Sequence, residues 1–271
     1  MAKIKGHEYE SYILDYYKKI AAKNGLSPTS SMQDQYIRDS EIAFCIGEIE
    51  RYILEVGKQD ITFFEVGCGN GHLLAILRER FPKIKLFALE FTPELYTQAT
   101  SREIPNCQIV LGDARDIAFY PENVDLIISE RVIINILSRK GQFQAFHNIA
   151  NSLLPGGRYI QIESYSEPLA ELNSALKEML LDGLEESRHN KYLYEKMLGF
   201  MHQRTGLVEI DGHMPKNFLS THFYVTRVFH KSILPKGGKV KFSRMAKFFV
   251  DALPIGIGNY SPILFRVFQK N

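Results

Sequence analysis

The feature that most constrains the fold is the stretch of residues 63–74, in which an apolar run ends in a carboxylate and alternating glycines follow. Gly67, Gly69 and Gly71 lead directly into a helical pattern. This order predicts a buried strand, a tight backbone turn and a helix N-terminus, the arrangement with which α/β sheets bind nucleotide-like cofactors. A nicotinamide or flavin fingerprint would need a third glycine at His72, so the pattern E-x-G-x-G-x-G points to another cofactor.

A second apolar run, residues 84–90, also ends in an acid. Glu90 lies 25 residues after Glu65, which leaves room for one crossover helix over residues 73–81 and a returning strand. A carboxylate at the tip of the second strand can accept hydrogen bonds from both hydroxyls of a ribose, as acids do in dinucleotide-binding folds. Glu90 is therefore predicted to contact the cofactor.

Three more β-rich segments follow in the same order. Residues 107–111 run into Gly-Asp, residues 124–131 end in Ser-Glu-Arg, and residues 153–163 combine a helix end, a Pro-Gly-Gly turn and a strand. Strands that alternate with helical patterns predict a largely parallel sheet with helices on its faces. The polar ends of these strands are expected to meet at one edge of the sheet.

These five segments resemble, in their order, the motifs of class I S-adenosylmethionine (SAM) dependent methyltransferases, including the Leu-x-Pro-Gly-Gly turn at residues 153–157. The resemblance implies an α/β fold with a seven-stranded, mostly parallel, doubly wound sheet whose last strand is antiparallel. N-terminal helices and a helical insertion after strand five complete the expected fold. It also implies SAM as the methyl donor and S-adenosylhomocysteine as the product.

The resemblance further implies which residues hold the cofactor. Glu65 would lie near the amino-acid end of SAM, and Asp113 would accept from the adenine amino group with Ala114 packed nearby. Arg38 could pair with the SAM carboxylate or lie on a solvated helix face, and both interpretations stay open. The predicted cofactor-binding set is Glu65, Gly67, Gly69, Asn70, Gly71, Glu90, Phe91, Asp113, Ala114, Glu130 and Arg38.

The first 60 residues precede the sheet and are predicted to form an N-terminal helical cap. A tyrosine-rich amphipathic helix is expected over residues 8–23 and a long helix over residues 34–56, where apolar residues recur at helical spacing. Residues 61–271 are predicted to form the SAM-binding domain. In the family, such an N-terminal extension commonly covers the cofactor.

An insertion at about residues 165–216 is too long for a simple connection and is expected to build the wall of the acceptor site. Helices are predicted there at residues 169–186 and 191–203. Residues 218–233, rich in Phe, Thr, Val and Tyr, are predicted as the sixth strand, and residues 262–268 as the seventh.

Composition limits the partners. The chain has 33 basic and 31 acidic residues, a net charge of +2, which does not imply a nucleic-acid binder. Three cysteines without a C-x-x-C pair argue against a zinc site or disulfide scaffold, no metal site is predicted, and a cytoplasmic location is expected. No signal peptide or membrane span is predicted. A homodimer through the tyrosine-rich first helix is possible.

One segment departs from this balance, because residues 231–247 carry six basic residues and no acid. An anionic partner, such as a phosphorylated small molecule, RNA or an acidic membrane surface, would explain the run. A solvated surface balanced by acids elsewhere is the favoured interpretation.

Methyl transfer is an in-line displacement, so the enzyme must mainly bring acceptor and methyl group together. A base is needed only where the acceptor loses a proton. His189, which titrates near neutrality, is the preferred base, and Glu130 at the end of strand four is the second. Glu163 at the end of strand five is a further candidate. The predicted acceptor contacts are Arg131, Tyr165, Asn190 and Tyr192.

The motif Arg131-x-x-x-Asn135, together with His189, Asn190 and Tyr192, resembles a branch of bacterial methyltransferases associated with sugar, surface-polysaccharide or secondary-metabolite biosynthesis. The leading hypothesis is therefore methyl transfer to oxygen or nitrogen of a sugar-like or natural-product acceptor. An RNA- or protein-modifying methyltransferase and a non-catalytic SAM-binding protein are the alternatives. The lack of an N-P-P-[YFW] motif after strand four argues against amino-methylation of adenine, cytosine or glutamine.

Overall fold

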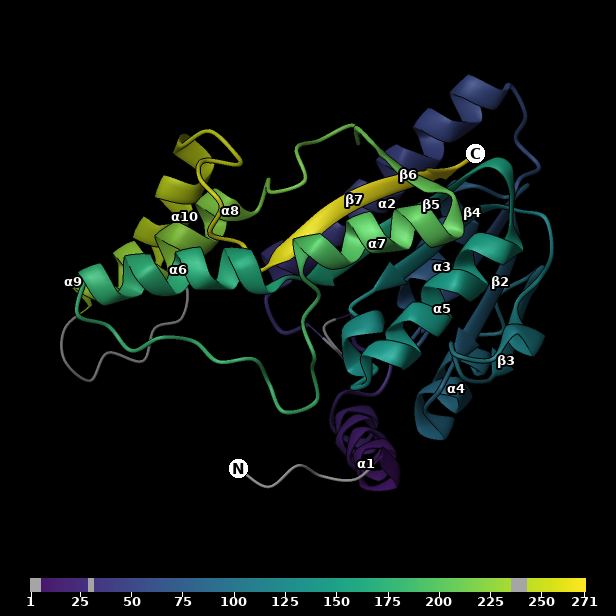
Figure 1. Ribbon diagram of the computed structural model, residues 1–271, viewed down its shortest axis with the longest axis horizontal. Helices are drawn as coiled ribbons and strands as arrows, with labels where there is room; N and C mark the ends of the chain where they lie inside the picture. Colours follow the sequence, from purple (N-terminus) through teal and green to yellow (C-terminus); the bar gives the residue numbers. More distant parts are fainter. Residues whose placement is uncertain (1–5, 29–31, 235–242) are drawn as a thin grey trace.

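A seven-stranded sheet with the order β3-β2-β1-β4-β5-β7-β6 runs through the part of the chain that the structure describes, residues 6–28, 32–234 and 243–271. In this computed structural model, helices cover both faces of the sheet and a helical lobe extends from one end (Figure 1). The strands are β1 (Thr62–Val66), β2 (Lys85–Glu90), β3 (Cys107–Leu111), β4 (Val124–Glu130), β5 (Leu153–Ser164), β6 (Leu207–Ile210) and β7 (Ile263–Lys270).

The direction of the strands confirms the predicted sheet. β1 pairs in parallel with β2 on one side and β4 on the other, and only β7 runs antiparallel to its neighbours β5 and β6. Because the chain crosses from β1 outward to β2 and β3 and then returns to β4, the strand order reverses beside β1. Ligands of open α/β sheets bind at the carboxyl ends of the strands at such a point.

The helices occupy two layers and the lobe. Alternating side chains of β1 face two cores, with Phe63 packed on the layer of α2 and α3 and Phe64 on the layer of α5 and α7. The helices are α1 (Gly6–Asn24), α2 (Gln35–Val56), α3 (His72–Arg80), α4 (Pro93–Thr100), α5 (Arg139–Ser152), α6 (Ser166–Glu178), α7 (Glu195–Thr205), α8 (Ser220–Phe223), α9 (His230–Ile233) and α10 (Arg244–Ala252), with the short 3₁₀ helices η1 (Ile117–Phe119) and η2 (Ile133–Asn135) and the π-helix η3 (Tyr224–Phe229).

The two N-terminal helices have different positions. α2 begins after Asp34, whose carboxylate accepts from the backbone of Ile37, and ends at Gly57 in the left-handed conformation. Its residues Phe44 and Ile49 are fully buried in the core against the sheet. α1, in contrast, stands away from the sheet beside the ends of the strands (Figure 1).

The predicted sixth strand at residues 218–233 is wrong. Residues 220–233 form the continuous helical run of α8, η3 and α9, and the sixth strand is the four-residue β6, which lies inside the predicted insertion. The run packs against α6 and α10 and is buried on most sides. A helix that is buried on most sides carries apolar residues all around, so its sequence lacks the apolar spacing typical of a helix with one buried face. The aromatic and β-branched residues then favoured a strand, although tertiary packing selects a helix.

The insertion helices also differ from their predicted bounds. α6 covers residues 166–178 and α7 residues 195–205, so the chain between them is a loop.

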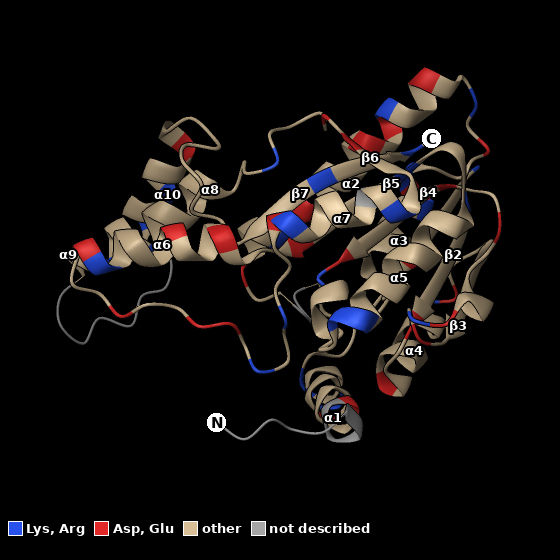
Figure 2. Cartoon of the chain, in the orientation of Figure 1, with Lys and Arg blue, Asp and Glu red and all other residues tan. Residues whose placement is uncertain are grey.

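Basic and acidic residues are interspersed over the sheet and its helices (Figure 2). Across the described residues, none of the helices combines the length and apolar character that crossing a membrane requires.

Candidate active site

A cavity of about 490 Å³ opens at the carboxyl ends of β1, β2 and β4. Ten of the eleven predicted cofactor residues line it, and Gly71 is the exception. The ten are Arg38, Glu65, Gly67, Gly69, Asn70, Glu90, Phe91, Asp113, Ala114 and Glu130. The structure thus brings together residues that the sequence spreads over five segments.

The glycine loop is shaped by its neighbours and by the cavity. At Gly67, with φ of +76°, an added Cβ would lie 2.4 Å from Val132 Cγ2. At Gly69, with φ of +57°, an added Cβ would meet no described atom within 4 Å, so the space beside this residue belongs to the cavity. Both positions need the left-handed conformation that glycine adopts without strain.

Glu90 ties the loop to the second strand. Its carboxylate accepts from the backbone N–H of Gly69 and from that of Thr92, both at 2.8 Å, while it also lines the cavity. A carboxylate offers about four lone-pair positions, so acceptor capacity remains for a ligand. Glu90 therefore has a structural role in the loop in addition to the predicted ribose contact.

Glu65 provides a test of whether this cavity suits SAM. The side chain is buried, and within the described residues no hydrogen-bond donor reaches its Oε2 atom. Burial, and then the charge of Glu130, raise the pKa of Glu65 well above its ordinary value. An unpartnered buried carboxylate oxygen on the cavity wall fits the ammonium group of an amino-acid ligand.

At the end of β3, the carboxylate of Asp113 is already bound by a neighbouring side chain, which the sequence did not predict. Both carboxylate oxygens of Asp113 accept from Arg115 Nε, at 2.9 and 3.0 Å, and Arg115 also pairs with Glu10 of α1 at 2.7 Å. Asp113 lies on the cavity wall, but its carboxylate is shared with this arginine. The contact also fastens the first helix to the strand end.

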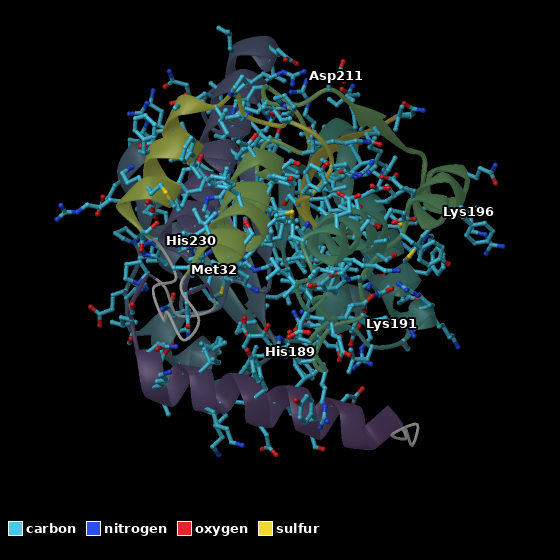
Figure 3. The ribbon with its side chains drawn as sticks, turned by 90° about the vertical axis from the view of Figure 1, so that its left-hand side faces the viewer. Met32, His189, Lys191, Lys196, Asp211 and His230 are labelled. Atoms are coloured by element: carbon cyan, nitrogen blue, oxygen red, sulfur yellow. The ribbon has the colours of Figure 1, made fainter. Side chains whose placement is uncertain are left out.

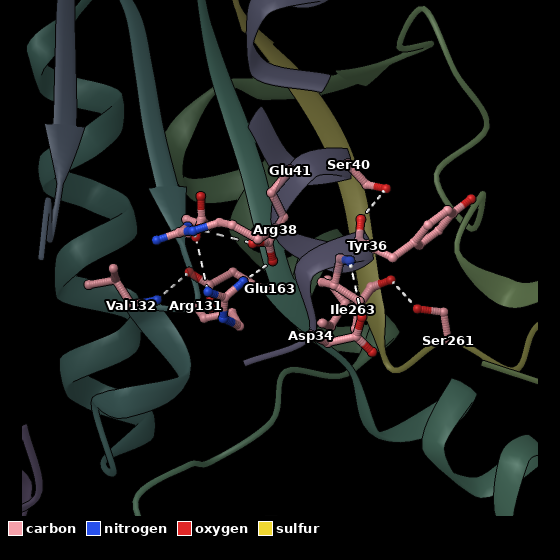
Figure 4. Close-up of polar contacts among 12 residues, drawn as sticks. Asp34, Tyr36, Arg38, Ser40, Glu41, Arg131, Val132, Glu163, Ser261 and Ile263 are labelled. Carbon is pink, nitrogen blue, oxygen red and sulfur yellow. Dashed lines mark hydrogen bonds and ion pairs between the residues drawn. The ribbon is translucent and has the colours of Figure 1, made fainter. Parts of the chain in front are cut away.

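Two arginines and two glutamates form a buried ion cluster between the cavity and α2 (Figure 4). Arg38 pairs closely with Glu130 and lies 3.7 Å from Glu41, and Arg131 pairs closely with Glu41 and lies 3.0 Å from Glu130. Buried charges persist only when they are paired. The ion pairs of the cluster therefore fix the positions of the Arg38 and Glu130 side chains on the cavity wall.

Arg131 has an unusual backbone, with φ of +55°. Such a conformation costs a non-glycine residue about 1–3 kcal/mol and persists only where the surroundings impose it. Here Glu163 imposes it in part, because its carboxylate accepts from the backbone N–H groups of Val132, Ile133 and Ile134 at 3.0, 2.9 and 3.3 Å. Burial raises the pKa of Glu163 to about 7. Glu163 lines neither cavity of the site, so it orients the turn.

A second cavity of about 220 Å³ adjoins the first and shares Tyr17, Glu130, Arg131 and Asn135 with it. Five of the residues predicted to act on the acceptor line this cavity. They are Glu130, Arg131, His189, Asn190 and Tyr192. Tyr165 lies outside both cavities: its ring is fully buried and its hydroxyl donates to Gln161.

His189 lies against the first helix (Figure 3). Its ring stacks on Tyr16, with centroids 3.9 Å apart, and meets Tyr17 edge-on. Burial lowers the pKa of His189 below its ordinary value, so the neutral imidazole, which can accept a proton, is favoured near pH 7.

Several contacts hold α1 and the loop after it over the site. Lys18 pairs with Glu94 at 3.3 Å, and Tyr17 donates to Asn135 at 3.0 Å. The side-chain amide of Asn70 donates to the backbone carbonyls of residues 25 and 27, both at 3.0 Å. Asn70 was predicted as a cofactor contact; it lines the cavity, and its amide group also binds this loop to the glycine turn.

Sequence reasoning missed several residues of the site, among them Glu10, Tyr17, Glu41 and Arg115. The spacing of Arg38 and Glu41, three apart on a helix, is a signal that could have predicted an ion pair. Tyr17 lies in the tyrosine-rich helix, but nothing in its local pattern distinguishes it from the neighbouring tyrosines. The contacts of Glu10 and Arg115 depend on how α1 lies over the strand ends.

Comparisons with known proteins match the same part of the chain. Residues 63–157 match a family model described as a methyltransferase domain. This region is thus similar to methyltransferase domains, in agreement with the class I, SAM-dependent methyltransferases that the five motifs resemble. The family resemblance expected from the five motifs, and SAM as the cofactor of this domain, are confirmed.

A search of curated proteins finds relatives that match part of the chain. Trans-aconitate 2-methyltransferase of Escherichia coli is 28% identical over 94 residues, which are 34% of this chain and 35% of that protein. The chain thus spans about a third of the length of the curated relatives that it matches.

The solved structures extend the likeness to the whole fold. Magnesium protoporphyrin IX methyltransferase from Synechocystis PCC 6803, solved with bound SAM, has a TM-score of 0.58 and 10% identity and covers all of both chains. Geranyl diphosphate C-methyltransferase from Streptomyces coelicolor has a TM-score of 0.54 and 13% identity, with 98% of each chain covered. At such identities the likeness shows the fold alone.

Proposed function

We propose that the protein transfers a methyl group from SAM to an oxygen or nitrogen atom of a small-molecule acceptor held in the second cavity. The observation that carries this proposal is the pair of adjoining cavities with common walls of Tyr17, Glu130, Arg131 and Asn135. The larger cavity carries the glycine loop and the strand-end acids Glu65, Glu90 and Asp113 that are expected for SAM. The smaller one begins where an acceptor would have to meet the methyl group.

In this proposal the residues of the larger cavity bind and orient the cofactor. Glu65 accepts from the ammonium group, Glu90 from the ribose hydroxyls, and Arg38 pairs with the carboxylate. SAM, when bound, supplies an electrophilic methyl group on a sulfonium. The first helix covers the larger cavity with Ile13 and Tyr17 and thereby restricts the access of water.

His189 is the better of the two predicted bases. Glu130 is engaged by both Arg38 and Arg131, so proton uptake there would leave two buried arginines with less compensating charge. The imidazole of His189 is neutral near pH 7 and lines the acceptor cavity. It would accept the proton that a hydroxyl or protonated amine loses on methylation.

The size and lining of the second cavity support a compact acceptor. Its volume of about 220 Å³ is below the range typical of drug-sized ligands. Tyr16, Tyr17, Tyr192 and His189 provide flat rings with polar edges, a lining suited to a sugar-like or natural-product acceptor with several hydroxyl groups.

The decisive test measures release of S-adenosylhomocysteine from SAM with a panel of hydroxylated and amine acceptors. We expect turnover with a compact acceptor, and His189→Ala should reduce it about 100-fold without changing SAM affinity. His147→Ala is the matched control, because His147 is an exposed histidine on α5. Tight SAM binding with no turnover would favour a non-catalytic binding protein. RNA binding that weakens steeply with salt would favour the macromolecular alternative.

A further inference from the structure

The helical lobe exposes an apolar surface that methyl transfer does not use. On α10, Ala246 and Val250 face the core of the lobe, whereas Met245 and Phe248 face away from it, and Phe248 is 65% exposed. The chain continues from α10 through an exposed segment rich in aliphatic residues. We define the α10 surface as Met245, Phe248, Leu253, Ile255 and Ile257, each at least 39% exposed.

The segment that carries the three aliphatic residues is held in place. Thr221 donates to the carbonyl of Pro254, and Ser220 donates to the carbonyl of Ile257 at 2.7 Å. Asn217 donates to the carbonyl of Gly256. These hydrogen bonds fix the backbone while Leu253, Ile255 and Ile257 remain exposed, so the apolar surface is preformed. A large exposed apolar surface on an ordered segment marks an interaction site.

The charge in this part of the chain is mainly positive. In the sequence, residues 231–257 contain six basic residues, of which those at 236, 239 and 241 lie outside the described residues, and a single acid, Asp251, which pairs with Lys247 at 2.9 Å. On the described elements Arg244 and Lys247 of α10 are exposed on the same helix as Met245 and Phe248, and Lys231 is exposed on α9. Basic residues that flank exposed Phe, Leu and Ile side chains are the pattern of helices that lie in the interface of an anionic membrane.

We propose that the α10 surface docks on an anionic phospholipid membrane. The exposed apolar side chains would enter the boundary between headgroups and acyl chains, and the basic residues would contact the negative headgroups. Charge argues against a second copy of the chain as the occupant, because two such surfaces would bring their positive segments together. A membrane surface offers both the apolar phase and the opposite charge.

The docking surface is connected to the candidate site through one helical run. Phe223 at the end of α8 lines the acceptor cavity, and the run continues through η3 and α9 to Lys231. Docking would therefore hold the acceptor cavity near the lipid surface. The proposal does not depend on methyl transfer, because membrane binding can be measured without SAM or an acceptor.

The test is flotation of the full chain with vesicles of phosphatidylcholine alone and of phosphatidylcholine mixed with phosphatidylserine. We expect binding to the mixed vesicles only, weakened by salt. Phe248→Asp should reduce the partition coefficient at least about tenfold, and Lys231→Gln about fivefold. Leu54→Asp is the matched control, because Leu54 is 83% exposed on α2, outside the α10 surface, and should bind as the wild type does.

The thermal unfolding of each variant checks that its fold is retained. Failure of the wild type to bind the mixed vesicles would overturn the proposal, and so would equal binding to both vesicle types. Folded Phe248→Asp protein that floats like the wild type would also overturn it. Self-association that is lost in Phe248→Asp, without vesicle binding, would identify a second copy as the occupant instead.

Discussion

The cofactor side and the acceptor side of the site are built differently from the same chain. The cofactor side collects residues at successive strand ends, from Glu65 to Glu130, and several are fixed by backbone hydrogen bonds within or beside the glycine loop. The acceptor side combines α1, the loop before α7, the end of α8 and the start of β7. The side chains of the acceptor side are held mainly by ring stacking, as between Tyr16 and His189, and by hydrogen bonds between distant segments, as between Tyr17 and Asn135.

The residues that bind the cofactor therefore lie next to strand ends in the sequence, whereas the residues that form the acceptor wall come from distant segments. Substitutions on the cofactor side should therefore change SAM affinity strongly. Those on the acceptor side should change turnover and leave SAM affinity nearly constant. The following predictions test that separation, beginning with the largest expected effect.

Glu90→Ala should weaken SAM binding at least about 100-fold, because it removes the predicted ribose acceptor and the partner of two loop N–H groups. Calorimetric titration with SAM and S-adenosylhomocysteine measures the effect, with NAD as a ligand that should not bind. Glu79→Ala, an exposed glutamate on α3, is the control. Unchanged SAM affinity in folded Glu90→Ala protein would contradict the assignment of the cofactor side.

Gly69→Ala compared with Gly57→Ala separates ligand contact from backbone strain. Both glycines have positive φ, and an added Cβ at either would meet no described atom within 4 Å. Each substitution should therefore lower the free energy of unfolding by about 1–2 kcal/mol. Only Gly69 lines the cavity, so only Gly69→Ala should lower SAM affinity, by about tenfold, in calorimetry. Equal SAM affinities would show that the cofactor does not lie against this residue.

The pH dependence of turnover tests the acceptor side. Burial lowers the pKa of His189, so the acidic limb of the rate profile should have its midpoint below about 6.5. The same shift affects stability: below about pH 6.5 the unfolded chain binds a proton that the folded protein resists, so stability falls as the pH decreases toward the lowered pKa. His189→Asn should remove both effects. An acidic limb that persists in this variant would assign the base to another group.

Glu10→Ala should have the smallest effect. It removes the contact between α1 and Arg115 while Arg115 keeps its pairing with Asp113. Because the pair is partly exposed, we expect SAM to dissociate about threefold faster, with little change in turnover. Stopped-flow displacement of bound SAM measures this rate. Glu50→Ala, which breaks an exposed pair with Arg80 far from α1, should leave it unchanged.

The predictability of the chain follows the same division. The first five strands and their polar ends followed from local patterns, because each strand end and its polar residue are adjacent in sequence. The resemblance to class I methyltransferases implied the antiparallel last strand and the cofactor set, of which ten residues line the cavity. The strand predicted at residues 218–233 was wrong because its surroundings, α6 and α10, are distant in sequence. Tyr165 was predicted as an acceptor contact, yet its ring points into the core where Arg266 stacks over it.

Local patterns in the sequence encode the first five strands, the glycine turn and the acids at the strand ends, because backbone geometry and buried apolar runs are encoded over short distances. Only the tertiary structure decided that Asn70 fastens the loop after α1, that Glu163 orients the turn at Arg131, and that His189 stacks on Tyr16. Each of these contacts joins segments at least 29 residues apart in the chain. Their formation depends on how the helices pack, which no local pattern specifies.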